Sequence, residues 1–298
     1  MSTLDFGFTI YPTARGEGRA VASLMDYNRR CLRSLPQRFT TIWVEDHFQW
    51  GELATLECLT TLSLLAGEFP TLRFGTLVLG QSYRNPALTA KMAANLHYIT
   101  SGRFILGIGA GWKEDEYQAY GYPYPPAKVR VAQMDEAIQI IRALWKNAPA
   151  TFKGTYYQIE NAYCEPRPQS AIPLMIGGSG EQLVLRSVAR YADWWNHNFC
   201  TAEEYARKHE VLRRHCEAIG RDPSIIKPTY YGIINLPKDP TQVSKSPLHI
   251  IGGSPQQVID ELGTFIQLGI SHMILRFSDI ESLERFSSEV LPHLPEQV

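Results

Sequence analysis

A short apolar stretch ends abruptly in Glu45, Asp46 and His47. An imidazole at a strand end can donate a hydrogen bond or a proton to a polarised ring nitrogen or a carbonyl near neutral pH. The alternative is a histidine that only satisfies a local hydrogen bond. We expect His47 to act in catalysis with Asp46 beside it. Both are also metal-ligand types, but no second histidine follows at H-x-H spacing, so we predict no metal site.

Two glycine-rich segments can bring the backbone close to a ligand. Gly107–Gly111 resembles a dinucleotide fingerprint, but Trp112 stands where G-x-G-x-x-G requires glycine, so the match is weak. The segment predicts a close backbone approach to a flat ligand, or only a tight turn. Pro173–Gly180 runs from an apolar stretch into glycines and then a helical pattern. Such a junction can bind phosphate through free N–H groups, with the Ser179 hydroxyl as a further donor. The alternative is that the glycines are present only because the turn has no space for side chains.

Three further features remain open at this point. Gly252–Pro255 resembles the second glycine segment, but Pro255 lacks an N–H and Ser254 is typical of a helix cap, which favours a structural role. Arg276 can pair with a phosphate or carboxylate, or form a surface salt bridge. Aromatic residues near expected strand ends can line an apolar pocket or belong to the core: Trp50, Trp112, Trp194, Trp195 and Phe277.

Eight short, β-branched apolar runs must position these residues, and helical patterns follow most of them. The runs are Phe6–Ile10, Thr41–Glu45, Arg73–Val78, Phe104–Gly109, Pro173–Ile176, Asp193–Asn196, Pro228–Ile234 and His272–Phe277. Asn85-Pro86 and Ser254-Pro255 with Gln257 are typical helix starts.

This alternation predicts an α/β fold, a (β/α)₈ TIM barrel, in a single domain over residues 1–298. A doubly wound open sheet is the rival, because it uses the same units. Lys153–Thr155 joins two aromatic stretches and predicts a hairpin between the fourth and fifth strands. In a barrel, the charged strand end at residues 45–47 faces the mouth, where active sites are built.

Composition limits the classes of partner. The 298 residues are 44% hydrophobic and 20% charged, typical of a globular protein. With 29 basic against 30 acidic residues, we expect no nucleic-acid or membrane partner held by charge, and a small-molecule substrate instead. Five scattered cysteines and no recognisable signal peptide or spanning segment predict a cytoplasmic protein.

Four segments together resemble the bacterial-luciferase-like superfamily of flavin and deazaflavin oxidoreductases. They are Glu45–Phe48, Gly75–Leu79 with Arg84–Pro86, Ser101–Trp112 with Glu116-Tyr117, and Ile176–Gly180 with Tyr191–Trp194. Their order and spacing are more specific than any one segment, and they favour the barrel over the open sheet.

The resemblance implies roles for particular residues. A bulge, often with a non-prolyl cis peptide, would lie near Leu77-Val78 and touch the cofactor ring. His47 and Asp46 would lie beside the reacting atom of the ring. The other cofactor contacts would come from Ala110, Gly111 and Trp112 at the ring and from Gly177, Gly178, Ser179 and Gly180 at the phosphate.

The Asp46–Gln49 run resembles the deazaflavin-using branch, so we expect coenzyme F420 and hydride transfer to or from a small organic substrate. Where that branch's sugar-phosphate dehydrogenases place a catalytic glutamate, this chain has Trp112, which leaves Glu114 as a displaced candidate acid. The alternatives are an FMN-dependent monooxygenase using reduced flavin and O₂, and a non-catalytic flavin-binding barrel. The resemblance also implies a homodimer.

Overall fold

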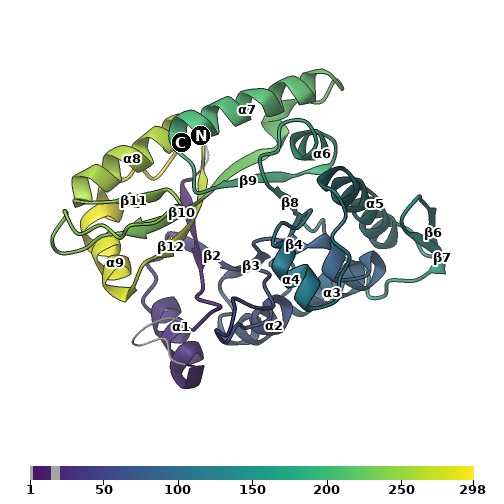
Figure 1. Ribbon diagram of the computed structural model, residues 1–298, viewed down its shortest axis with the longest axis horizontal. Helices are drawn as coiled ribbons and strands as arrows, with labels where there is room; N and C mark the ends of the chain where they lie inside the picture. The colour runs from purple at the N-terminus through teal and green to yellow at the C-terminus, as the bar shows by residue number, and fades with distance from the viewer. Residues whose placement is uncertain (1–2, 15–20) are drawn as a thin grey trace.

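The computed structural model describes residues 3–14 and 21–298 (Figure 1). Eight parallel strands close into a barrel, which confirms the predicted (β/α)₈ architecture and the eight predicted runs. The strands are β1 (Asp5–Thr9), β2 (Phe39–Val44), β3 (Arg73–Thr76), β5 (Phe104–Gly109), β8 (Leu174–Gly177), β9 (Trp194–Asn198), β10 (Lys227–Asn235) and β12 (His272–Phe277). The β1–β12 pairing, with Phe6 opposite Met273, closes the ring.

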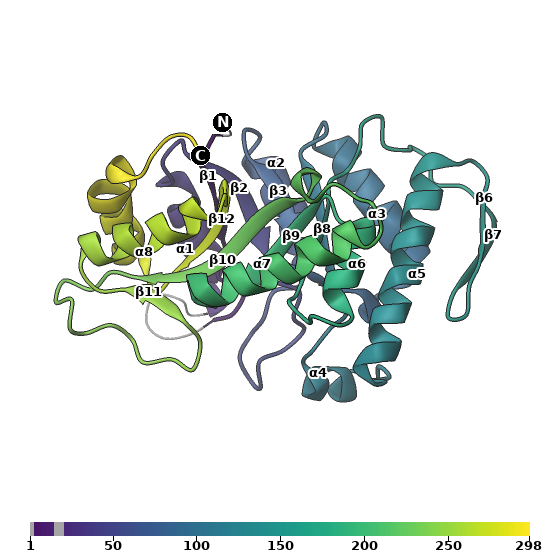
Figure 2. The same ribbon diagram turned by 90° about the horizontal axis from the view of Figure 1, so that it is seen from above.

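Helices surround the barrel, as the two orthogonal views show (Figures 1 and 2). They are α1 (Leu24–Arg33), α2 (Cys58–Glu68), α3 (Pro86–Ile99), α4 (Glu114–Ala119), α5 (Ala127–Lys146), α6 (Val184–Tyr191), α7 (Ala202–Glu217), α8 (Pro255–Gln267) and α9 (Ile280–Arg285). Single 3₁₀ turns lie at Val21–Ser23, Gln81–Tyr83, Pro223–Ile225 and Leu291–His293, and a π-helical turn at Phe286–Val290. None of the described helices is long and apolar enough to cross a bilayer.

Local sequence signals set the two helix starts that the sequence predicted. The Asn85 side chain accepts the N–H of Ala87 at the start of α3. Ser254 caps α8 by accepting the N–H of Gln257, whose side chain bonds back to the Ser254 N–H. The second of these is a capping box, and it confirms the structural interpretation of the residue 252–255 segment.

The predicted hairpin is confirmed between the fourth and fifth barrel strands. It consists of β6 (Ala150–Lys153) and β7 (Gln158–Ala162), which pair in antiparallel fashion and lie at the outer side of α5 (Figure 2). The Glu136 carboxylate of α5 accepts backbone N–H groups of residues 155–157 in the turn. Two further short strands, β4 (Leu79–Gly80) and β11 (Ile250–Gly252), extend the sheet beside β5 and β10.

Buried side chains fill the interior of the barrel below the C-terminal ends of its strands. Trp43 lies at the centre with Trp194, Met175 and other buried residues of neighbouring strands. A Cβ on Gly7 or on Gly75 would overlap the Trp43 indole, which explains glycine at both positions. Any ligand site within the barrel must therefore lie above this layer.

Candidate active site

A cavity of about 930 Å³ opens at the C-terminal ends of the barrel strands. This volume is at the upper end of the range typical of small-molecule and cofactor pockets. Most of the predicted site residues line it: Asp46, His47, Leu77, Val78, Ala110, Gly111, Trp112, Gly177 and Gly178. The tertiary structure therefore brings together the segments that follow the second, third, fourth and fifth barrel strands.

His47 is held in place by a carboxylate that is distant in the sequence. Its Nδ1 lies 3.0 Å from Oε2 of Glu116, a residue of α4 whose side chain is completely buried. The other Glu116 oxygen accepts the backbone N–H groups of Phe48 and Gln49, and Tyr83 donates its hydroxyl to Oε2 at 2.9 Å. With Nδ1 engaged, Nε2 is the ring nitrogen of His47 that remains for a ligand.

These contacts keep Glu116 in its anionic form. Burial by itself would raise the pKa of Glu116, but the hydrogen bonds from His47 and from the N–H groups of Gln49 and Phe48 lower it below its ordinary value. The pKa of Tyr83 is raised by burial and by the neighbouring Glu116 charge, so its hydroxyl remains a donor. Glu116 can therefore accept a hydrogen bond from Nδ1 of His47 over the whole neutral range.

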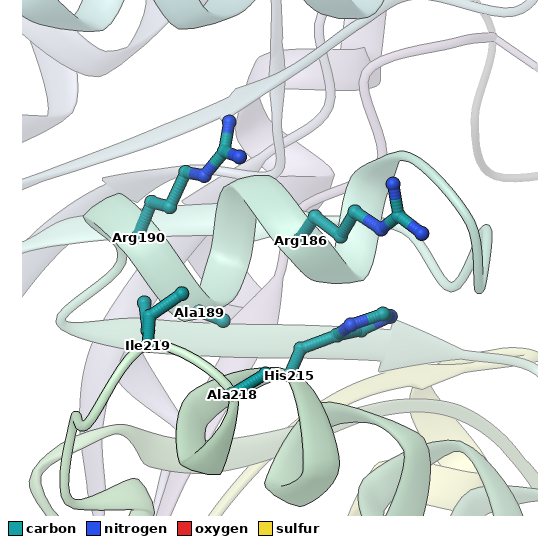
Figure 3. A pocket seen from close by; sticks show the side chains of 6 residues that line it. All are labelled: Arg186, Ala189, Arg190, His215, Ala218 and Ile219. Atoms are coloured by element: carbon teal, nitrogen blue, oxygen red, sulfur yellow. The ribbon is translucent and has the colours of Figure 1, made fainter.

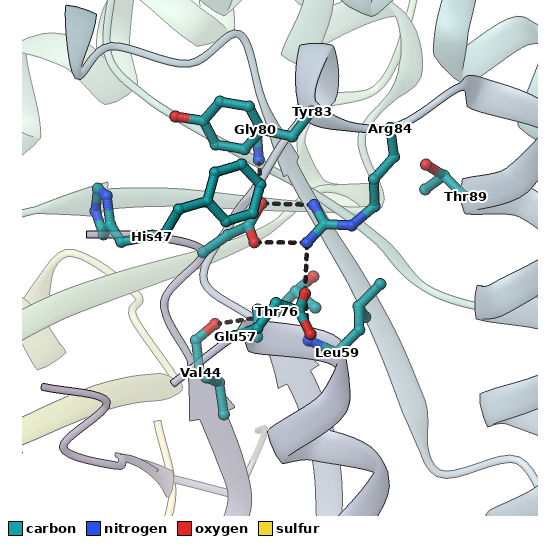
Figure 4. Close-up of polar contacts among 12 residues, drawn as sticks. Val44, His47, Glu57, Leu59, Thr76, Gly80, Tyr83, Arg84 and Thr89 are labelled. Atoms are coloured by element: carbon teal, nitrogen blue, oxygen red, sulfur yellow. Dashed lines mark hydrogen bonds and ion pairs between the residues drawn. The ribbon is translucent and has the colours of Figure 1, made fainter. Parts of the chain in front are cut away.

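Asp46 directly precedes His47 but has a different set of partners, which include Gly80 and Arg84 (Figure 4). Its two carboxylate oxygens accept hydrogen bonds from the two terminal nitrogens of Arg84, at 2.8 and 2.9 Å. One of these oxygens also accepts a hydrogen bond from the N–H of Gly80. Arg84 further donates to Glu57, the residue that caps α2. The Asp46 side chain is fully buried. This geometry favours a positioning role for Asp46 in place of the expected catalytic one.

Backbone and the Val78 side chain form the cavity wall where β3, β5 and β8 end. A non-prolyl cis peptide bond lies between Leu77 and Val78, at the position that the resemblance implied. The Val78 side chain lies between two glycines, because a Cβ on Gly109 or on Gly177 would come within 2.9 Å of its methyl carbons. This wall of backbone and one branched side chain is suited to the face of a planar ring.

The predicted phosphate loop lies at the edge of this wall, and only part of it faces the cavity. Gly178, with a φ of +122°, lines the cavity, whereas Ser179 and Gly180 are not among the lining residues. The Gly178 N–H is already bonded to the carbonyl of Asn196. Anion binding at this loop would therefore depend on the N–H groups that follow Gly178.

Aromatic side chains form the rim next to His47. The ring centroid of His47 lies 4.8 Å from that of Trp50 and 5.7 Å from that of Trp112. Trp112 is 65% exposed, at the entrance. The Lys113 ammonium lies 5.1 Å from the Trp50 ring and pairs with Asp115. Aromatic groups thus shield one side of the imidazole from water.

The structure does not support Glu114 as the displaced acid. Glu114 is the first residue of α4, exposed to solvent, and its carboxylate accepts a bond from Gln118. Two residues apart on a helix, side chains are rotated by about 200° from each other. Because Glu116 points inward to His47, Glu114 points outward, and it does not line the cavity.

The remaining aromatic candidates have mixed positions. Phe277 lines the cavity. Trp194 belongs to the layer of side chains below it, and Trp195 packs among buried residues between the barrel and the helices. Arg276 also lines the cavity, 3.5 Å from a carboxylate oxygen of Glu45. Of the contacts expected from the sequence, Arg276 forms the pairing with a carboxylate, and it does so with a side chain of the protein inside the cavity.

A second, smaller hollow lies on the outside of the barrel, between α6 and α7 (Figure 3). Its volume is about 230 Å³, and it is lined by Arg186, Ala189, Arg190, His215, Ala218 and Ile219. None of the residues predicted to act in catalysis or cofactor binding lines this hollow. The large cavity at the barrel mouth is therefore the candidate active site.

Sequence reasoning gave no role to Glu116, Tyr83, Arg84 or Glu45. Three of them occur in the segments that carry the resemblance: Glu45 before Asp46, Arg84 before Asn85-Pro86 and Glu116 before Tyr117. Their place in these segments was the sequence signal that could have pointed to a role in the site. Local patterns do not show, however, that Glu116 contacts both His47 and Tyr83.

Comparisons with known proteins agree with this geometry. The family model of the luciferase-like monooxygenases matches residues 36–246. An F420-dependent glucose-6-phosphate dehydrogenase of Kineococcus radiotolerans is 26% identical and covers 94% of this chain and 95% of its own length. A phthiodiolone/phenolphthiodiolone dimycocerosates ketoreductase of Mycobacterium tuberculosis is 35% identical over 59% of this chain and 46% of its own length.

Solved structures show the same fold. An F420-dependent secondary alcohol dehydrogenase, in complex with an F420-acetone adduct, superposes with a TM-score of 0.84 at 18% identity, over 97% of this chain and 98% of that one. A monooxygenase, RslO1 of Streptomyces bottropensis, has a TM-score of 0.80 at 16% identity, over 97% and 99% of the two chains. The relatives are oxidoreductases, which confirms the predicted enzyme class. Because the family model covers most of the barrel, this chain belongs to the luciferase-like monooxygenase family.

Proposed function

We propose that this protein binds a deazaflavin, coenzyme F420, and moves a hydride to or from a small organic alcohol or carbonyl compound. Curated relatives that match 94% and 86% of the chain carry F420 dependence in their names. The observation that carries the proposal is the imidazole of His47, which lines the cavity while Glu116 holds its Nδ1 at 3.0 Å. A ring held in this way is prepared for proton transfer at one defined atom.

The protein supplies binding, orientation and proton transfer, and a bound deazaflavin would supply the hydride chemistry. When an alcohol is oxidised, Nε2 of His47 takes the hydroxyl proton, and in reduction it returns a proton to the carbonyl oxygen. The imidazolium formed in between is stabilised by the buried Glu116 carboxylate, which also fixes the tautomer of the neutral ring. Trp50 and Trp112 exclude water from one side of this step.

The residues of the cavity suit the proposed cofactor. Val78, Gly109 and Gly177 would hold the ring, because no side chain other than Val78 rises between the two glycines. Beside the phosphate loop, the basic side chains of Arg207 and Lys208 share the single carboxylate of Glu181. This small excess of positive charge is favourable for a phosphate and for an anionic tail.

Parallel fluorescence titrations with F420 and FMN test the cofactor. We expect F420 to bind at least about tenfold more tightly, a difference of about 1.4 kcal/mol. Tighter binding of FMN would favour the monooxygenase alternative. Binding of neither would show that the cofactor assignment is wrong and that the glycines at 177, 178 and 180 form only a turn.

Substitution of His47 tests the proton-transfer role. His47→Ala should lower kcat by about 100-fold or more while the F420 affinity changes little. His293→Ala is a matched control, because His293 is exposed in the C-terminal segment and does not line the cavity. Unchanged turnover in His47→Ala would contradict the role.

We also propose that the protein is a homodimer. Exposed apolar side chains on α2 and α3 support this, among them Leu64, Leu88, Tyr98 and Ile99. Burial of such side chains in an interface is favourable at about 25 cal/mol per Å². Light scattering after size exclusion should give twice the 33.7 kDa chain mass, and a monomeric mass would contradict this proposal.

A further inference from the structure

Three polar side chains of the cavity wall form a connected group. Glu45 follows β2, Tyr231 belongs to β10 and Arg276 to β12, and all three line the cavity. The Tyr231 hydroxyl donates to one Glu45 oxygen at 3.0 Å, and the other oxygen lies 3.5 Å from Arg276. The Arg276 and Glu45 side chains are only 24% and 14% exposed. The group is therefore a shielded ion pair with a third, neutral member.

The positive charge of Arg276 is balanced by the neighbouring Glu45 carboxylate. Burial lowers the pKa of Arg276, but the neighbouring Tyr231 and Glu45 raise it above its ordinary value, so the guanidinium stays charged. The pKa of Tyr231 is raised by burial and by Glu45, so its hydroxyl remains protonated. Charges at this separation interact strongly when shielded from water, and a second anion near Arg276 would be repelled by Glu45.

The other charged side chains of the cavity wall are compensated in the same way. Besides Glu45 and Arg276, the acidic or basic lining residues in the described part of the chain are Asp46, His47 and Lys113. Asp46 pairs with Arg84, His47 with Glu116 and Lys113 with Asp115. The described wall thus offers no cation without a partner to a phosphate or carboxylate.

We propose that Glu45 determines substrate specificity: by neutralising Arg276 it makes the substrate half of the cavity select uncharged alcohols or carbonyl compounds and reject phosphorylated or carboxylated ones. This inference rests on the proposed hydride-transfer function and adds the substrate class. An anionic substrate would lose its hydration and meet no free cation, which is costly. Apolar side chains next to the pair, Phe199 and Ile233, offer favourable contacts to an uncharged substrate.

Inorganic phosphate is the probe that isolates this effect, with binding measured by calorimetry. The protein is first saturated with F420 or FMN, whichever binds more tightly. The bound cofactor then fills any phosphate site in the residue 177–180 loop. If neither cofactor binds, the purified protein is used. Glu45→Gln keeps an oxygen that can accept the Tyr231 hydroxyl but removes the negative charge. We expect phosphate to bind this variant on the order of tenfold more tightly than the wild type.

Two further variants assign the gain to Arg276. Glu45→Gln combined with Arg276→Gln should lose the added affinity, and Glu45→Asp, which keeps the charge, should resemble the wild type. Equal phosphate affinity of the wild type and Glu45→Gln would overturn the proposal, as would retention of the gain in the double variant. Phosphate binding to the wild type that Arg276→Gln abolishes would also overturn the proposal.

Turnover gives an independent readout. With F420 bound, the wild type should oxidise uncharged secondary alcohols with a kcat/KM at least about tenfold above that for glucose 6-phosphate. Preference for glucose 6-phosphate would overturn the specificity proposal and leave the hydride-transfer function intact. Failure to bind F420 would instead contradict the proposed function, and the phosphate measurements would still decide whether Glu45 masks Arg276.

Discussion

Nδ1 of His47 and Oε2 of Glu116 lie 3.0 Å apart although the two residues are separated by 69 positions in the sequence. The Glu116 carboxylate also accepts hydrogen bonds from the Tyr83 hydroxyl and from two backbone N–H groups of the segment after His47. One buried carboxylate therefore fixes both the ring of His47 and the loop that carries it. This relationship makes Glu116 a positioning residue for the proposed proton transfer.

Glu116→Gln should lower kcat by about tenfold or more and leave KM and the cofactor affinity nearly unchanged. The amide can either donate to or accept from Nδ1, so the tautomer of His47 is no longer fixed. Steady-state kinetics give the split between kcat and KM, and ¹⁵N NMR of the imidazole reports the tautomer. A merely structural role would leave the wild-type tautomer in place. Glu114→Gln, at the exposed start of the same helix, is the matched control.

Asp46→Asn should destabilise the protein by about 3 kcal/mol, because it leaves the buried Arg84 guanidinium without its bidentate anionic partner. Urea denaturation measures the change in the free energy of unfolding. The double variant Asp46→Asn with Arg84→Met should recover part of the loss, since it removes the guanidinium whose charge only Glu57 would still balance. Additive losses from the two substitutions would contradict this account.

Gly177→Ala should weaken cofactor binding more than it weakens the fold. The new Cβ would lie 2.9 Å from a Val78 methyl carbon, so Val78 must move into the space proposed for the ring. We expect a loss of affinity of about tenfold or more in the fluorescence titration. Gly263→Ala is the control, because no atom lies within 4 Å of its Cβ position in α8. It should stabilise the protein by about 0.5–1 kcal/mol.

His197 should make stability depend on pH on the acid side of neutrality. Burial lowers its pKa to about 4, against an ordinary value of 6.5, and its Nδ1 accepts the N–H of Asn198. The folded state therefore binds fewer protons than the unfolded state between these values. The contribution of His197 is complete above about pH 6.5 and falls by up to about 1.4 kcal/mol per pH unit down to about pH 4.

His197→Phe tests this dependence, because it keeps an aromatic ring beside Trp195 and Tyr205 but does not titrate. Urea midpoints between pH 7 and pH 4.5 should fall less steeply in the variant than in the wild type, whatever the offset at pH 7. Equal slopes for the two proteins would show that His197 does not carry the effect.

The sequence by itself determined the barrel, the order of its strands and the family. Runs such as His272–Phe277 and caps such as Ser254 with Gln257 are local signals, since they depend on residues within a few positions of each other. The motif around His47 also placed its imidazole at the barrel mouth, because charged residues after a barrel strand face that end.

Only the tertiary structure decided which side chains meet there. It places Glu116, and not Glu114, next to His47, because the orientation of α4 points one carboxylate to His47 and the other to solvent. It also forms ion pairs between Asp46 and Arg84 and between Glu45 and Arg276. These contacts join residues from separate β/α units, and barrel closure, which no local pattern encodes, sets their distances.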